Sequence, residues 1–164
     1  MSLVIDIQRA CDEAEQPSTS WLRRVARLAL ADLDQAEVNL RLVDTEESRQ
    51  LNHHYRSRDR ATNVLSFPSC LPPGAGPVHL GDVVLCAPVI TAEAAVQGKS
   101  ARDHWAHMVI HGLLHLCGFD HIEAVEAERM EAEEIRLLAE LGIDDPYCPV
   151  AGEPAGGDTR MTTT

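Results

Sequence analysis

The stretch HGLLHLCGFDH, from His111 to His121, constrains the fold of this 164-residue chain more than any other. It holds three of the eight histidines of the chain. An α-helix turns about 100° per residue, so His111 and His115 lie about 40° apart on one helical face, one turn above the other. Gly118 can adopt the left-handed conformation that ends a helix and turns the chain back, which returns His121 toward the first two histidines. The spacing therefore predicts a metal site built from three imidazoles.

Three neutral histidines suit Zn²⁺ and leave a fourth coordination position for water. The same spacing occurs in metzincin proteases, whose motif HExxHxxGxxH places the catalytic glutamate directly after the first histidine. Here that position is Gly112, which counts against a metzincin-type protease. Cys117, the thiol nearest to the site, lies about 200° round the helix from His115 and is expected to point into the core. We therefore predict one Zn²⁺ per chain, bound by His111, His115 and His121.

His104 and His107 precede these three histidines on the same predicted helix. His104 is about 20° from His111 in helical projection, two turns earlier. We expect both to be polar residues of the helix face near the site, or hydrogen-bonding partners of the ligands, rather than ligands themselves.

The composition limits the class of protein. A chain of 164 residues with 45% hydrophobic residues suits one soluble globular domain. No apolar run approaches the roughly 20 residues needed to cross a bilayer, and the N-terminus lacks the features of a signal peptide, so we expect a cytoplasmic protein with no membrane partner. The five cysteines are scattered and form no CxxC pair, which argues against disulfides and against a thiolate zinc site. No P-loop, GxGxxG or GxSxG motif is present, and no organic cofactor is expected.

Hydrophobic periodicity predicts a single α/β (α+β) domain over residues 1–145, with about four strands and about five helices in mixed order. Gly81, inside one expected strand, indicates a bulge or a close approach of two backbones. Residues 146–164 contain little that can be buried and are expected to form a disordered tail. The strands are expected at 3–8, 36–44, 63–67 and 78–86, and the helices at 21–33, 45–55, 88–97, 101–117 and 124–142.

Charge is unevenly distributed along the chain. The formal net charge of −12 argues against a nucleic-acid partner if it is considered alone. However, the segment 49–60 holds four arginines and a single acidic residue, Asp59. A binding face acts through its local charge, so the overall acidity weakens a nucleic-acid hypothesis without excluding it.

Three stretches taken together closely resemble the bacterial YbeY family. They are YRSRDRATNVLSFP (55–68), HLGDVVLCAP (79–88) and HWAHMVIHGLLHLCGFDH (104–121), in that order. The resemblance implies a small mixed sheet with a zinc site in a cleft, and His111, His115 and His121 as zinc ligands. It also implies a metal-dependent, single-strand-specific endoribonuclease that acts in rRNA maturation (the 16S rRNA 3′ end) and in small ribosomal subunit assembly and quality control. The functionally important arginine of the family falls on Arg56.

Cleavage of RNA builds negative charge on the phosphoryl oxygens. A zinc ion bound by three histidines can lower the pKa of bound water to about 7, and a guanidinium offers paired donors to phosphate. We therefore expect Arg56 to clamp the phosphate and stabilise the transition state. Arg58 and Arg60 are expected to follow the RNA backbone, and Ser66 to help position RNA. No residue is an obvious general base, although Asp82 and Asp120 are acidic candidates near the site.

Two other functions remain open from the sequence. The chain could be a ribosome-assembly binding factor whose zinc is mainly structural, in which case a fourth protein ligand would close the metal site. It could also be a zinc hydrolase acting on peptides or small molecules, although Gly112 counts against the peptidase version.

Overall fold

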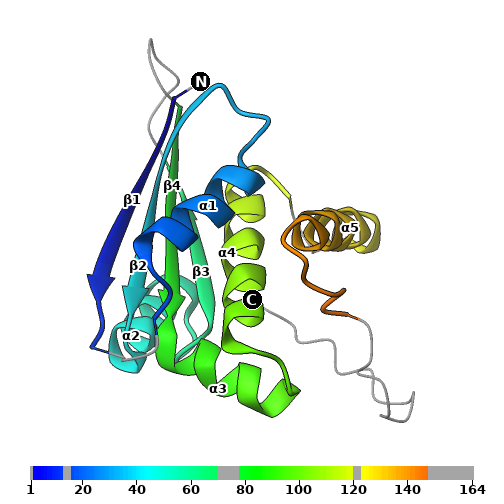
Figure 1. Cartoon of the computed structure of the whole chain (residues 1–164). Coiled ribbons are helices and arrows are strands. Elements are labelled where there is room, and N and C mark those ends of the chain that lie inside the picture. The colour runs from blue at the N-terminus through cyan, green and yellow to red at the C-terminus, as the bar shows by residue number, and fades with distance from the viewer. Residues whose placement is uncertain (1, 13–15, 70–77, 120–122, 148–164) are drawn as a thin grey trace.

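A computed structural model describes residues 2–12, 16–69, 78–119 and 123–147. At its centre is a four-stranded mixed sheet with the spatial order β1-β2-β4-β3 (Figure 1). The first three of these strands in space are parallel, and β3 pairs antiparallel with β4 along one edge. The predicted fold class, a small mixed sheet with helices, is confirmed. The strands are β1 (Ser2–Ala10), β2 (Gln35–Val43), β3 (Val64–Pro68) and β4 (Val78–Cys86).

Five helices surround the sheet, and they divide between its two faces. On one face, α4 packs against β3, β4 and α1, and α5 packs against α4 on the side away from the sheet (Figure 1). On the other face, α2 contacts β4 and α3, and its Leu51 packs in a small separate cluster of buried side chains. The helices are α1 (Thr19–Ala29), α2 (Thr45–Arg56), α3 (Ala87–Gln97), α4 (Ala101–Leu116) and α5 (Ala124–Glu140).

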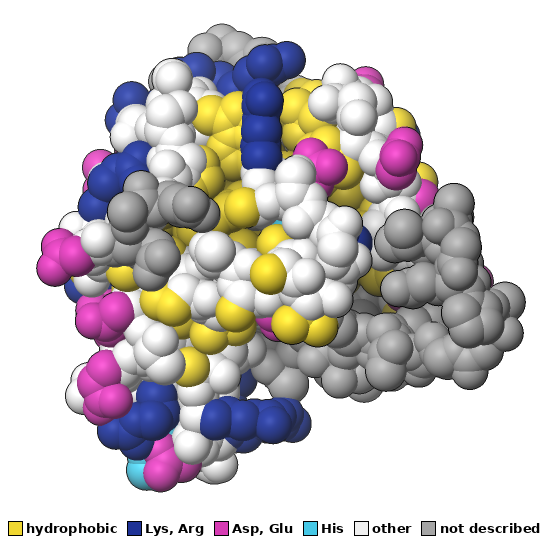
Figure 2. Space-filling model, turned by 60° about the horizontal axis from the view of Figure 1, so that its bottom comes forward, with side chains coloured by type: hydrophobic (Ala, Val, Ile, Leu, Met, Phe, Trp, Pro, Cys, Tyr) yellow, Lys and Arg dark blue, Asp and Glu magenta, His cyan; other side chains and the backbone are white. Residues whose placement is uncertain are grey.

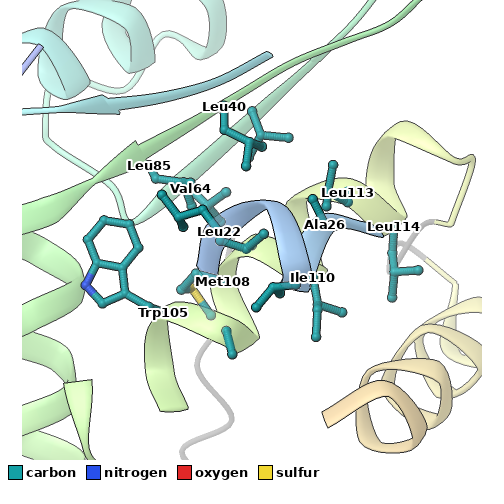
Figure 3. Close-up of a cluster of buried hydrophobic side chains, with 14 of the residues drawn as sticks. Leu22, Ala26, Leu40, Val64, Leu85, Trp105, Met108, Ile110, Leu113 and Leu114 are labelled. Atoms are coloured by element: carbon teal, nitrogen blue, oxygen red, sulfur yellow. The ribbon is translucent and has the colours of Figure 1, made fainter. Parts of the chain in front are cut away.

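Helix α4, which holds the histidines, is the centre of the hydrophobic core. Every residue from His104 to Leu114 is buried, because α4 is surrounded by the sheet, α1, α3 and α5. Figure 3 shows Met108, Ile110 and Leu113 of α4 among side chains from α1 and the sheet. Burying one side chain of this size contributes about 1.5–3 kcal/mol, so dense packing on all sides holds the position of α4. The ends of its histidine side chains are thus fixed by the core.

Gly81 lies opposite Pro68, where β3 and β4 are in close contact. Its φ is +132°, and a Cβ atom at this position would lie 2.1 Å from the carbonyl oxygen of Phe67. The register between β2 and β4 also shifts opposite Gly81, between Glu37 and Val38. The predicted bulge and close approach are therefore both present, and only glycine fits there.

The boundary between domain and tail stays a prediction, although two residues just beyond it contact the domain. The tail was expected to begin at residue 146, but Pro146 and Tyr147 contact the domain: Lys99 Nζ donates to the Pro146 carbonyl, and the Tyr147 hydroxyl donates to Glu134. Tyr147 lies far along the chain from its partner, so periodicity gave no sign of this contact. The remaining tail residues, 148–164, lie outside the described part of the chain. No helix in the described ranges is long and apolar enough to cross a membrane.

Candidate functional site

His111 and His115 bring two imidazole nitrogens together at the C-terminal end of α4. Their Nε2 atoms are 3.1 Å apart, as their positions one helical turn apart predicted. The Nδ1 atom of His115 lies 3.1 Å from the carbonyl oxygen of Phe119, and the Nδ1 atom of His111 lies 3.4 Å from Oε1 of Glu134. A carbonyl and an ionised carboxylate can only accept a hydrogen bond, so both Nδ1 atoms carry the proton. Both Nε2 atoms therefore present lone pairs toward each other.

This arrangement fits a divalent cation. Two lone pairs at such a short separation repel each other unless a proton or a cation lies between them. In a tetrahedral zinc site with Zn–N distances near 2.0–2.1 Å, two ligand nitrogens lie roughly 3.3–3.4 Å apart. The observed 3.1 Å differs from that separation by only a few tenths of an ångström. The two nitrogens are thus close enough together to bind one metal ion.

The chain turns back at Gly118 after the end of α4, as the sequence predicted. Gly118 has a φ of +99°, and the Phe119 N–H donates to the carbonyl of Leu114 at 3.0 Å, so the chain turns back after the helix. His121 itself lies outside the described residues, as does Asp120, and their predicted roles stay predictions. The expectation for Cys117 is wrong: its side chain is exposed, because α4 ends at Leu116 and the thiol leaves the packed part of the helix.

A buried carboxylate that the sequence analysis did not single out stands beside these histidines. Glu134 of α5 is only 1% exposed, and three groups donate to its two oxygens. These are Nδ1 of His111, Nε2 of His107 and the hydroxyl of Tyr147, the last at 3.0 and 3.1 Å. One sequence signal could have identified it. Glu134 is the one acidic residue on the buried, apolar side of α5, which also holds Met130, Leu137 and Leu138.

The protonation states of this cluster follow from burial and hydrogen bonding. Burial alone would raise the pKa of Glu134, but hydrogen bonds from His107 and His111, with their charge, outweigh it and bring the pKa to about 2. Burial lowers the pKa of His107, and the bond to Glu134 offsets only part of this change. Burial and the charge on Glu134 raise the pKa of Tyr147. At neutral pH, therefore, Glu134 is an ionised carboxylate and Tyr147 keeps its proton.

A second group of residues could also hold a metal ion. One ligand atom from each of His107, His111 and Glu134 lies within 4.8 Å of the others, and all three residues are buried. In that arrangement the ion would be enclosed by protein. The pair formed by His111 and His115 differs, since His115 is partly exposed. Of the two arrangements, only the one formed by His111 and His115 has a side that substrate or water can reach.

Gly112 packs against the sheet. A Cβ atom there would lie 2.5 Å from Cγ1 of Val83, 3.0 Å from Cγ2 of Val64 and 3.3 Å from Oγ of Ser66. The hydroxyl of Ser66 donates to the carbonyl oxygen of Gly112 at 2.9 Å. A side chain at position 112 would collide with Val83 and Val64 of the sheet, which leaves no room for the long glutamate of a metzincin protease. Ser66 fixes β3 to α4 directly beside His111, and its role in RNA binding stays a prediction.

The arginine segment, residues 56–60, lies across the edge strand β3 from α4. Arg56 ends α2, and Arg58 and Arg60 follow in the connection to β3, all three with exposed side chains. In the described part of the chain none of the three forms an ion pair, whereas Arg49 on the same helix is paired with Glu46 and Asp59. Three unpaired guanidinium groups thus face solvent. Basic side chains are also visible on the face shown in Figure 2, where they alternate with acidic ones along the left edge.

Buried polar side chains hold this connection in place. Asn52 Nδ2 donates to the Arg60 carbonyl at 2.8 Å. The Ser48 hydroxyl donates to the Thr62 carbonyl at 2.9 Å and accepts from the Thr62 N–H at 3.0 Å. Asn52 and Ser48 are both 1% exposed, so the backbone between α2 and β3 is fixed although its arginine side chains are exposed.

An aromatic contact connects the arginine segment to the histidine site. Tyr55 is 61% exposed, and its ring packs edge-on against Phe67, with centroids 5.0 Å apart. The next residue back along β3, Ser66, is bonded to Gly112. Arg56 and His111 therefore belong to helices on opposite faces of the sheet, and the edge strand β3 links them.

Asp82, one of the two acidic candidates for a general base, does not face α4. It pairs with Phe67 across β3 and β4, and neighbours directly across a sheet share a face. Phe67 contacts Tyr55 of α2, and Asp82 accepts from Asn39 Nδ2 at 2.7 Å. Two acids among the described residues, Glu93 and Glu134, contact histidines of α4, and both already accept hydrogen bonds from them.

Comparison with known proteins decides the family. The family model described as "Endoribonuclease YbeY" matches residues 4–142. The chain belongs to the YbeY family. An "Endoribonuclease YbeY" of Pseudomonas putida strain W619 is 55% identical over 147 residues, which are 88% of this chain and 93% of that protein. One of Halorhodospira halophila is 60% identical over 115 residues, 68% of this chain and 74% of that protein.

A solved structure supports the fold. The solution structure of TM1509 from Thermotoga maritima has a TM-score of 0.59 and 24% identity to this chain, covering 84% of this chain and 89% of the other. At that identity the likeness concerns the fold alone. The match to the YbeY family runs from within β1 to just past α5, so the histidine site and the arginine segment both lie inside it.

Proposed function

We propose that this chain is a metal-dependent endoribonuclease whose zinc ion is held by His111, His115 and His121. The observation that carries the proposal is the pair of Nε2 atoms 3.1 Å apart, each on a ring whose Nδ1 faces an acceptor. Three protein ligands leave one coordination position open, as catalytic zinc sites require. The relatives named as endoribonucleases supply the reaction class.

The partly exposed site suits catalysis better than the enclosed one. A metal ion held by His107, His111 and Glu134 would be surrounded by buried side chains and could not meet a polynucleotide. It would also replace the hydrogen bonds that Glu134 receives from His107 and Tyr147. The pair His111 and His115 keeps these hydrogen bonds intact. Glu134 then serves as a partner of a ligand rather than as a ligand.

Residues around the β3 edge would bind the RNA. Zn²⁺, when bound, acts as a Lewis acid and lowers the pKa of coordinated water. Arg56 would donate paired hydrogen bonds to the phosphate and stabilise charge on its oxygens, while Arg58 and Arg60 would neutralise neighbouring phosphates. The exposed ring of Tyr55 offers a surface on which an unpaired base can stack. This combination of exposed arginines and one exposed ring favours single-stranded RNA over a duplex, whose bases are already stacked.

The physiological substrate would be precursor rRNA. The likeness of the three motifs to the family suggests maturation of the 16S rRNA 3′ end and quality control of the small ribosomal subunit in the cytoplasm. In that setting the small subunit or its proteins would be partners of this chain.

A cleavage assay with measured metal content tests the proposal. Wild type, His115→Ala and Arg56→Glu are incubated with a single-stranded RNA that spans the 16S 3′ end. We expect His115→Ala to lose zinc and cleavage, and Arg56→Glu to lose cleavage while keeping zinc. Arg24→Glu, an equal charge change at an exposed position of α1, should keep both. Absence of cleavage by zinc-loaded wild-type protein would overturn the proposal.

A further inference from the structure

The acidic helix α5 contributes one buried group that the proposed reaction does not use directly. Glu126, Glu128 and Glu140 of α5 are exposed, but Glu134 is turned inward and is 1% exposed. A buried carboxylate is costly unless it is well hydrogen-bonded, and this one accepts from three donors. Glu134 therefore does more than add to the negative charge on the surface of α5.

We propose that Glu134 is a positioning residue for the metal site: it fixes the tautomer and orientation of His111, so that Nε2 of this ring faces the metal. The inference rests on the proposed function, because it takes His111 as a ligand. It gives α5 a part in metal binding.

The contacts of Glu134 suit this role. Its Oε1 atom lies 3.4 Å from Nδ1 of His111, so the proton stays on Nδ1 and the lone pair on Nε2, 3.1 Å from Nε2 of His115. A histidine that binds metal through one nitrogen commonly donates from the other to a carboxylate, which orients the ring and raises its basicity. His115 has a weaker counterpart, the neutral carbonyl oxygen of Phe119. The charge of Glu134 thus assists the ring of His111.

Two further groups hold the carboxylate itself. His107 Nε2 donates to Oε2, and the Tyr147 hydroxyl lies 3.0 Å from the same oxygen. His107 is on α4, one turn before His111, and Tyr147 follows α5. The carboxylate is therefore fixed from α4 and from the segment after α5, which limits how far it can turn away from His111.

A second carboxylate–imidazole pair on α4 offers a matched control. Glu93 of α3 accepts from Nε2 of the buried His104 at 2.9 Å, so it too forms a carboxylate–imidazole pair with α4. The hydrogen bond of this pair ends on His104, two helical turns before His111. Replacing Glu93 by Gln removes a comparable negative charge beside α4 without touching the rings assigned to the metal.

Zinc affinity of the full chain, measured by competition with a chelator, tests the inference. We expect Glu134→Gln to weaken zinc binding by about 10–100-fold and Glu93→Gln to leave it within about threefold. The visible spectrum of the Co²⁺-substituted protein should change in Glu134→Gln alone. Unchanged zinc affinity in Glu134→Gln, or an equal loss in both variants, would overturn the inference. His115→Ala tests the metal site itself, separately from the role of Glu134. If this variant binds zinc as tightly as wild type, the proposed metal site is wrong and the inference about Glu134 falls with it.

A measurement on wild type removes any dependence on how well Glu134→Gln folds. Nitrogen-15 NMR of the metal-free protein reports which nitrogen of each imidazole carries a proton. We expect His111 to be protonated on Nδ1 and unprotonated on Nε2. The opposite tautomer would overturn the inference whether or not the protein cleaves RNA.

Discussion

Replacing Gly112 by alanine tests the packing on which the histidine site depends. The added Cβ would lie 2.5 Å from Cγ1 of Val83 and 3.0 Å from Cγ2 of Val64. Two carbon atoms normally rest about 3.5–4.0 Å apart, so the Val83 methyl group must retreat by about 1 Å. Val83 is fully buried and its branched side chain has few rotamers, so α4 and β4 must separate instead.

The magnitude follows from two opposing effects. Overpacking a dense core costs about 1–3 kcal/mol, and the two close contacts place this substitution in the upper part of that range. Alanine in place of glycine inside a helix recovers about 1 kcal/mol. We therefore expect Gly112→Ala to lower the free energy of unfolding by about 1–2 kcal/mol. Zinc affinity should fall as well, because His111 directly precedes the displaced residue.

Urea unfolding of the metal-free protein measures the first effect. Ala132→Gly, at an exposed position in the middle of α5, reports the helix-propensity contribution alone and should cost about 1 kcal/mol. If Gly112→Ala proves about 1 kcal/mol more stable than wild type, propensity dominates and the packing described between α4 and the sheet is wrong. In that case a side chain would fit at position 112 and the exclusion of a protease-type acid would fail too.

Three further expectations concern RNA binding and acid stability. Tyr55→Ala should weaken binding of single-stranded RNA by about 1–3 kcal/mol in a filter-binding assay, because a stacked base loses its ring, while Tyr55→Phe should bind like wild type; equal losses would exclude stacking. Asn52→Ala should cost about 1–3 kcal/mol of unfolding free energy, since it leaves the Arg60 carbonyl without this donor, and should slow cleavage at unchanged zinc content; unaltered cleavage would mean that the loop needs no such support. The pKa of Glu134 falls from 4.5 unfolded to about 2 folded, so its stabilisation is present above pH 4.5 and lost as the pH falls toward 2. Metal-free wild type should therefore lose up to about 3 kcal/mol more than Glu134→Gln between pH 5 and 2, and parallel curves would contradict the shift.

Local pattern was enough to predict most of the fold. The periodicity of β2 and α4 and the glycine at 81 depend on neighbours in sequence, and each lies where it was predicted. The approach of His111 and His115 is of the same kind, because helix geometry alone sets it.

The rest depended on contacts between distant segments. Glu134 and Tyr147 join the site through hydrogen bonds from α4 to residues 23 and 40 positions later, which no local period encodes. Gly112 was interpreted as the absence of a catalytic acid, whereas the structure shows a helix in close contact with Val83 of the sheet. Cys117 was expected in the core because helical projection continues past the point where α4 ends.

We propose that His111, His115 and His121 together bind one zinc ion. A zinc-edge anomalous difference map from crystals of the zinc-loaded full chain tests it most directly. We predict a single peak per chain, about 2.0–2.1 Å from Nε2 of His111 and of His115, with His121 as the third protein ligand and no fourth. A peak coordinated by His107 and Glu134 instead, or a fourth protein ligand that closes the site, would contradict it.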